Sequence, residues 1–113
     1  MDKLSEYRQY IKQFLQEYIE ITNEQKIYEV DDFLVIDEVN DNYFWMTWGW
    51  DGKKRIKAIQ VFVRIKDDKI WVEEDWTEAG IANSLAEKGV PKENIVLGFQ
   101  PPEMRQYTDF AVA

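Results

Sequence analysis

The chain has 113 residues, of which 45% are hydrophobic and 32% charged, and its net charge at pH 7 is −8. This length suits one domain, and the composition is typical of a soluble globular protein rather than a disordered segment. The sequence contains neither cysteine nor histidine, which excludes disulfides, thiolate and imidazole metal sites, and a serine–histidine–aspartate triad. Catalysis would therefore have to use carboxylates, lysine, tyrosine or a cation held by oxygen ligands.

The charge and the absence of long apolar runs limit the partners. Proteins that bind duplex DNA unaided usually present a basic surface, because counterion release supplies much of the affinity. A net charge of −8 repels DNA, so strong direct nucleic-acid binding is not expected. No apolar run approaches the roughly 20 residues that cross a bilayer, and the N-terminus lacks the apolar centre of a secretory signal. We expect a cytoplasmic protein without membrane contact.

Residues 4–21 form the first predicted element. Their apolar side chains recur at alternating spacings of three and four, which predicts an amphipathic helix, and Asp2 can cap its start. The stripe is short for a coiled coil, so packing against a sheet is the favoured interpretation. Its members are Leu4, Tyr7, Ile11, Phe14, Leu15, Tyr18, Ile19 and Ile21.

Four stretches rich in β-branched and aromatic residues come next and predict strands. They span residues 27–37, 43–50, 56–65 and 69–74. The turn signals between them are Asn40-Asp41-Asn42, Asp51-Gly52 and Asp67-Asp68. Connections this short join antiparallel neighbours, which predicts a four-stranded meander.

The remaining segment changes to a helical period. Apolar residues from Ile81 to Ala86 indicate a helix that Gly89 and Pro91 end. The segment NIVLGF is short and extended, and PPEMRQY is a helical turn opened by proline. The predicted order is α-ββββ-α-β-α: a single α+β domain over residues 1–113, a four-stranded antiparallel meander with an N-terminal helix and short C-terminal helices.

Carboxylates gather around the fourth predicted strand. Asp67 and Asp68 precede it, and Glu73 and Asp75 stand at its end. Strict alternation would place Glu73 and Asp75 on one face and Glu74 on the other. A metal-dependent nuclease would also need a lysine just after the acidic pair, which WVEEDW does not supply.

Asp75 also suits a structural role. With Glu78 it has the spacing of a capping box, and Thr77 is a second possible cap. Acidic side chains are stabilising near a helix N-terminus. We favour a helix cap and a solvated strand end, and assign no catalytic, cofactor-binding or metal-binding residue. The alternative is a Mg²⁺-dependent nuclease that uses Asp67 or Asp68 with Glu73 or Asp75.

The second predicted strand carries bulky side chains on both faces. Alternation groups Phe44, Met46, Trp48 and Trp50 on one face and Tyr43 and Trp45 on the other. One helix and a few short elements can hardly cover both faces of a four-stranded sheet, so we predict an interface. Its candidate residues are Trp45, Trp48 and Trp50, and self-association through this strand or the helix stripe is expected. A small-ligand groove lined by aromatic residues is the alternative.

Two further segments have alternative interpretations. GKKRIK, residues 52–57, is the basic cluster of the sequence, and a solvated hairpin turn is favoured over contact with phosphate or an acidic partner. The chain ends on FAVA, where Phe110 and Val112 would share a face of an extended tail. We expect this tail to dock in a groove, on its own sheet or on a partner, and count both residues as interface candidates.

Specific motifs resemble those of one family. GWDGKKRI and the run DDKIWVEEDWTEAGIANSLAEKGVPKENIVLGFQPPEMRQYTDFAVA, with the opening MDKLSEYRQYIKQFLQEY, closely resemble the XisI family, the excision controlling factors of the cyanobacterial fdxN element. The resemblance implies an accessory role in programmed DNA excision. In that system a separate recombinase performs the strand chemistry, and XisI acts with XisH, a companion that looks like a nuclease-fold protein. It implies no catalytic residue and no cofactor. We therefore expect a non-enzymatic factor that binds a XisH-like protein.

Overall fold

The long N-terminal helix forms largely as predicted. The computed structural model describes residues 2–26 and 29–113, and helix α1 covers Lys3–Gln25. The side chain of Asp2 caps it by accepting a hydrogen bond from the Ser5 amide at 2.8 Å. Most of the predicted stripe is buried, but Ile21 is half exposed because it lies on the flank of that stripe, near the end of the helix. The buried members are Tyr7, Ile11, Phe14, Leu15 and Ile19.

The sheet has five strands in the order β1-β2-β3-β4-β5. The strands are β1 (Glu29–Asp37), β2 (Asn42–Asp51), β3 (Lys54–Lys66), β4 (Lys69–Asp75) and β5 (Ile95–Leu97). The first four form the predicted antiparallel meander. The part of the first predicted strand at positions 27 and 28 lies outside the described residues.

The predicted α+β fold and order of elements are confirmed, but the sheet has a fifth strand and is not uniformly antiparallel. β5 joins the sheet beside β4 and runs parallel to it. β5 can run parallel to β4 because the connection between them is a long crossover rather than a tight turn. Helix α2 (Ile81–Glu87) forms part of this crossover. Short turns of helix precede and follow β5: η1 (Lys92–Asn94) and η2 (Pro102–Tyr107).

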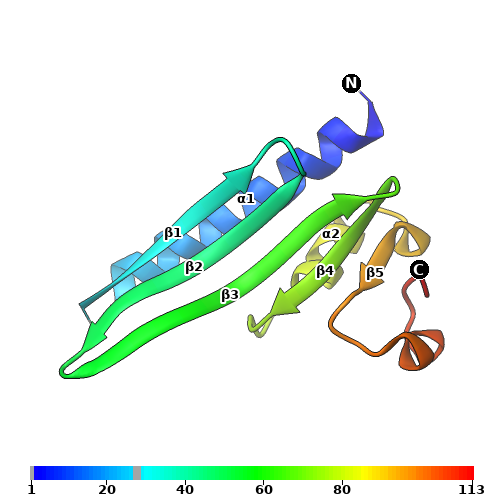
Figure 1. The fold of residues 1–113 in the computed structure, drawn as a ribbon. Coiled ribbons are helices and arrows are strands. Elements are labelled where there is room, and N and C mark those ends of the chain that lie inside the picture. Colours follow the sequence, from blue (N-terminus) through cyan, green and yellow to red (C-terminus); the bar gives the residue numbers. More distant parts are fainter. Residues whose placement is uncertain (1, 27–28) are drawn as a thin grey trace.

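The core lies between one face of the sheet and the two α-helices. Figure 1 shows α1 behind β1 and β2, and α2 behind β4, so both helices cover the same face. Along the part of the chain that the structure describes, neither helix crosses to the opposite face. The sheet residues of the core are Tyr43, Trp45, Val61, Val63, Ile65, Ile70, Val72 and Ile95.

Two β-bulges change which face the following residues occupy. The register shifts between Trp45 and Met46 of β2, and again between Phe62 and Val63 of β3. The second shift leaves Glu73 without a partner and sets Asp75 opposite the buried Val61. An extra residue inverts the alternation beyond it. The prediction that Glu73 and Asp75 share a face was therefore wrong, because Asp75 lies on the face that the helices cover.

Candidate protein-interaction surface

One face of the sheet carries a continuous set of large apolar side chains, and neither α-helix lies on it. Alternation along β2 is as predicted, with Phe44, Met46, Trp48 and Trp50 facing away from the core. Directly paired residues share a face, so the register adds members from β1 and β3. We call this surface the open sheet face; its apolar residues are Phe33, Val35, Phe44, Met46, Trp48, Trp50, Ile59 and Phe62.

Several of these side chains are substantially exposed. The exposed fractions are 50% for Trp50, 41% for Ile59, and 38% for both Phe33 and Trp48. Scattered apolar residues are normal on any surface, but adjoining large ones mark binding sites. Tryptophans are also frequent energetic anchors of interfaces. The open sheet face therefore has the chemistry of a protein-binding surface.

Arg55 contacts both tryptophans of the open sheet face. Its guanidinium carbon lies 4.9 Å from the centre of the Trp50 ring and 5.5 Å from that of Trp48. Both distances are within the range of a cation–π contact. The Arg55 side chain also donates a long hydrogen bond to the Gly49 carbonyl, at 3.5 Å. The rings are thus held in place before any partner arrives, which lowers the entropy cost of binding.

Trp45 is corrected from an interface candidate to a core residue. It is 7% exposed, and its indole Nε1 donates a hydrogen bond of 2.9 Å to the buried carboxylate of Asp32. Asp32 also accepts a hydrogen bond from the hydroxyl of Thr47. The alternation separated Trp45 from Trp48 correctly. The sequence did not show which of these two faces the helix covers.

The C-terminal tail docks on the protein's own sheet. The Ala111 amide donates to the Ile95 carbonyl at 2.8 Å, and Ala111 forms a parallel bridge with Val96 of β5. Phe110 is partly buried against the core. Val112 is 55% exposed and does not share that burial. Phe110 therefore stabilises the monomer, and an interface role for Val112 stays a prediction.

The predicted acidic cluster is dispersed along β4. Asp67 and Asp68 occupy the β3–β4 turn, each with a positive φ. At the other end, Glu73 accepts a hydrogen bond of 2.7 Å from Arg64. Glu73 and Asp75 lie in the last three residues of β4, whereas Asp67 and Asp68 precede its first residue, Lys69. Within residues 2–26 and 29–113, no group of three or more acidic side chains could hold a metal ion.

Asp75 stabilises the start of α2, although not as the predicted capping box. Its carboxylate accepts bonds from the Thr77 amide at 2.8 Å, the Thr77 hydroxyl at 2.6 Å and the Ile81 amide at 2.8 Å. The helix begins at Ile81, after Gly80. Asp75 thus reaches the first helical amide across a loop. The Thr77 hydroxyl in turn accepts a bond from the Gly80 amide at 3.1 Å.

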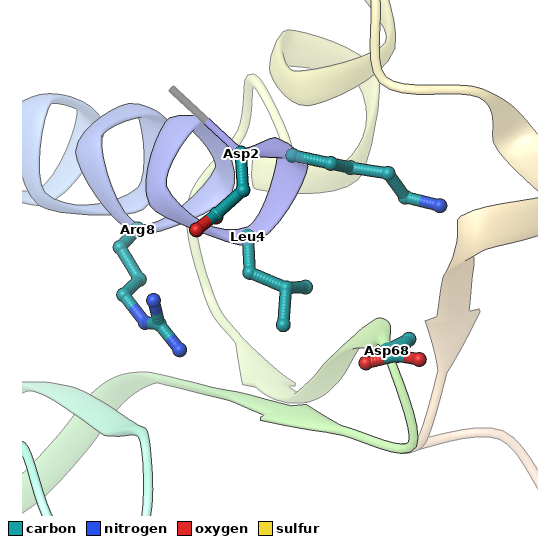
Figure 2. Close-up of a pocket in the computed structure, with 5 residues that line it drawn as sticks. Asp2, Leu4, Arg8 and Asp68 are labelled. Atoms are coloured by element: carbon teal, nitrogen blue, oxygen red, sulfur yellow. The ribbon is translucent and has the colours of Figure 1, made fainter.

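A shallow hollow of about 350 Å³ lies between the first turns of α1 and the β3–β4 turn. Figure 2 shows Leu4 pointing from α1 toward the turn that carries Asp68, with Arg8 to one side. Its lining residues are Asp2, Lys3, Leu4, Arg8 and Asp68, none of them aromatic. It does not correspond to the aromatic ligand groove considered from the sequence. The Arg8 side chain, which lines this hollow, already forms an ion pair with Asp41.

Comparison with known proteins decides the family. The model of the family described as XisI protein matches residues 1–112. The chain belongs to the XisI family. It is similar to a XisI-like protein from Anabaena variabilis ATCC 29413, with 39% identity and a TM-score of 0.89 over 98% of this chain and 100% of that one. No curated protein matches it in sequence.

A second solved structure connects the family to a process. This is the fdxN element excision controlling factor XisI from the same organism, with 41% identity and a TM-score of 0.88. The match covers 99% of this chain and 100% of the relative. Both structures confirm the family resemblance and the α+β fold. In the described part of this XisI-family chain, no helix is long and apolar enough to span a membrane.

Sequence reasoning missed the contribution of the neighbouring strands to the open sheet face. Phe33 stands opposite Met46 on one side, and Ile59 stands opposite it on the other. Phe62 stacks on Phe44 with ring centres 4.4 Å apart. The correct register of the β1–β2 hairpin would have placed Phe33 on this face. The bulge between Trp45 and Met46 hides the position of Ile59, because it has no clear sequence signal.

Proposed function

We propose that this chain controls excision of a DNA element without cleaving DNA itself, by binding a protein partner through the open sheet face. The family and the name of the second relative support a role in excision control. The observation that carries the interaction is the exposed Trp48–Trp50 pair on an apolar sheet face that neither α-helix covers. Such a face is costly to leave in water, and a protein partner would remove it from solvent.

The proposed partner is a XisH-like protein with a nuclease-type fold. A net charge of −8 makes the chain a poor ligand for DNA and a good one for a basic DNA-binding cleft. The chain would then compete with DNA for that cleft. This mechanism needs no catalytic group in the chain itself. The roles of Glu73 and Asp75, in an ion pair and at a helix start, support a non-enzymatic function.

Self-association through the open sheet face is the second candidate. The observation that favours it is the extent of the face, which spans three strands. Two copies packed face to face would bury the same tryptophans. Light scattering across a range of concentrations tests this directly. A strictly monomeric protein at high concentration would leave the face to a different partner.

The test of the leading proposal is co-purification of the chain with its XisH-like companion after co-expression. A complex of fixed stoichiometry that survives size-exclusion chromatography supports the proposal. The companion alone should bind DNA, and adding the chain should release that DNA. Separate elution of the two proteins under all salt conditions would contradict it.

A further inference from the structure

Strand β3 lies between β2 and β4 but, in the described part of the chain, its first half has no neighbouring strand on the β4 side. This strand is longer than its neighbour, and β4 pairs only with residues Val61–Lys66. Residues Lys54–Ile59 pair with β2 alone. At the boundary, the Gln60 carbonyl accepts the Trp76 amide at 3.0 Å. Figure 1 shows the β2–β3 hairpin reaching well past the end of β4. Among the described residues, no strand continues the sheet along this edge.

The outer edges of the sheet, at β1 and β5, differ from this free edge of β3 because other parts of the chain bond to them. At β1, the carbonyls of Val30 and Asp32 accept hydrogen bonds from Lys26 Nζ at 2.5 Å and Asn23 Nδ2 at 3.3 Å. At β5, the C-terminal tail bonds to Ile95. Natural proteins shield edges in this way to prevent unwanted strand pairing. The edge at Lys54–Ile59 keeps backbone groups that an extended segment can bond.

This free edge is also the most basic part of an acidic protein. Lys53, Lys54, Arg55 and Lys57 lie within the hairpin, although the whole chain carries a net charge of −8. Two copies paired edge to edge would bring these cations together, which disfavours a homodimer through this edge. An acidic extended segment suits both features of this edge. Its backbone can form hydrogen bonds with the unpaired backbone of β3, and its carboxylates can pair with the basic side chains.

We propose that the edge formed by Lys54–Ile59 receives an extended acidic segment of a partner protein as an additional strand. The register fixes the pattern of that segment. Arg55, Lys57 and Ile59 point to the open sheet face, since they pair with Trp50, Trp48 and Met46. The segment therefore has acidic residues at alternate positions and an apolar residue opposite Ile59.

Single-stranded nucleic acid fits this edge less well, although tryptophans beside cations can stack bases. Arg55 already lies over both Trp48 and Trp50, on ring faces that a base would need. On the far side, Trp48 is paired with Asp31 and Trp50 with Glu29. These carboxylates would repel a phosphate backbone. A nucleic acid would also leave the free backbone edge unused.

The test uses the full chain and a capped synthetic peptide in which glutamate alternates with threonine and ends on valine. Hydrogen exchange is followed by NMR with and without the peptide. The peptide should slow amide exchange within Lys54–Ile59 by at least about tenfold at saturation, as expected when a strand pairs with an edge. Exchange in Phe33 and Val35 of β1 should not change. The matched protein variant is Lys57→Glu, an exposed position on the face that the glutamates reach; it should lose the protection with an unchanged circular dichroism spectrum.

Three peptide and nucleic-acid controls decide the outcome. A version with lysine in place of glutamate should not protect the edge, and a version with alternate N-methylated amides should also fail. Equal binding of the N-methylated peptide would show that charge alone acts, and would overturn strand addition. Absence of protection at millimolar peptide would overturn the proposal, as would protection by an oligothymidylate but not by the peptide. The test needs no excision partner, so its result is independent of the function proposed above.

Discussion

Arg8 and Asp41 join the start of α1 to the β1–β2 turn by two parallel hydrogen bonds. Arg8 Nε lies 2.9 Å from Asp41 Oδ1, and Nη2 lies 3.0 Å from Oδ2. The buried Tyr43 hydroxyl donates a third bond to Asp41 Oδ1 at 3.0 Å. Asp41 has a positive φ, so its own backbone forms the turn that this ion pair holds. The Arg8 guanidinium lowers the pKa of the Asp41 carboxyl below its ordinary value.

Replacing Arg8 tests how much this pair contributes. Arg8→Gln should lower the free energy of unfolding because the pair is bidentate, and the loss should be modest because both side chains keep some exposure to water. Urea denaturation measures it. The matched control is Lys92→Gln, because the ion pair of Lys92 with Asp109, at 4.0 Å, is exposed, and among the described residues the Lys92 side chain otherwise makes only a cation–π contact with Phe110. Equal effects of the two substitutions would show that the Arg8 pair has no special role.

Tyr43 makes stability sensitive to alkaline pH. Burial, together with the hydrogen bond to Asp41, raises the pKa of Tyr43 from its ordinary 10.0 to about 12. The folded state therefore favours the neutral phenol. Its contribution is complete below pH 10.0 and is lost as the pH rises to about 12. Denaturant unfolding measured over this range should show a fall in stability that is smaller in Tyr43→Phe. The same slope in both proteins would refute the assignment.

Gly49 is required by the close approach of β1 to β2. A Cβ atom at this position would lie 2.5 Å from the Glu29 carbonyl oxygen and 2.7 Å from the Val30 Cα. Gly49→Ala should therefore cost about 1 to 3 kcal/mol of stability through overpacking. Gly52→Ala is the comparison, because nothing lies within 4 Å there and only its positive φ opposes a side chain. We expect thermal unfolding to show the larger loss for Gly49→Ala.

The dispersed carboxylates predict that the purified chain does not cleave DNA. Glu73 pairs with Arg64, and Asp75 bonds to the Ile81 amide, so neither is free to share a metal with Asp67 or Asp68. Incubation of plasmid DNA with the chain and Mg²⁺ or Mn²⁺ should leave the DNA intact. Glu73→Gln is the control. Cleavage by the wild type that disappears in this variant would establish a nuclease.

Local patterns predicted much of the fold but not its faces. The spacing of Tyr7, Ile11 and Phe14 in α1 and the turn signals of the meander were sufficient, because helices and hairpins depend on near neighbours. The pairing of β5 with β4 depends on a crossover, and the sequence near Ile95 does not encode its partner. The alternation of β4 failed at Glu73, since the bulge there arises from pairing with β3.

The candidate site was predicted only in part, because its faces also depend on tertiary packing. Alternation in β2 separated Trp45 from Trp48 and Trp50, and the structure keeps that separation. Which face becomes core is decided by the position of α1, a tertiary feature. Trp45 packs near Tyr18 of that helix, with ring centres 6.2 Å apart. The other two tryptophans of β2, Trp48 and Trp50, then stay on the surface. An aromatic strand thus indicates an interface, but the helix decides which residues form it.

The affinity of the chain for its XisH-like companion, measured by isothermal titration calorimetry, tests the central claim most directly. The variant Trp48→Ser combined with Trp50→Ser should weaken binding at least about thirtyfold, which corresponds to about 2 kcal/mol for anchors of an interface. Tyr107→Ser is the matched control, since Tyr107 is an exposed aromatic residue on η2, outside the open sheet face. Its affinity should equal that of the wild type. Unchanged binding of the double tryptophan variant, with its fold intact, would contradict the open sheet face as the partner-binding surface.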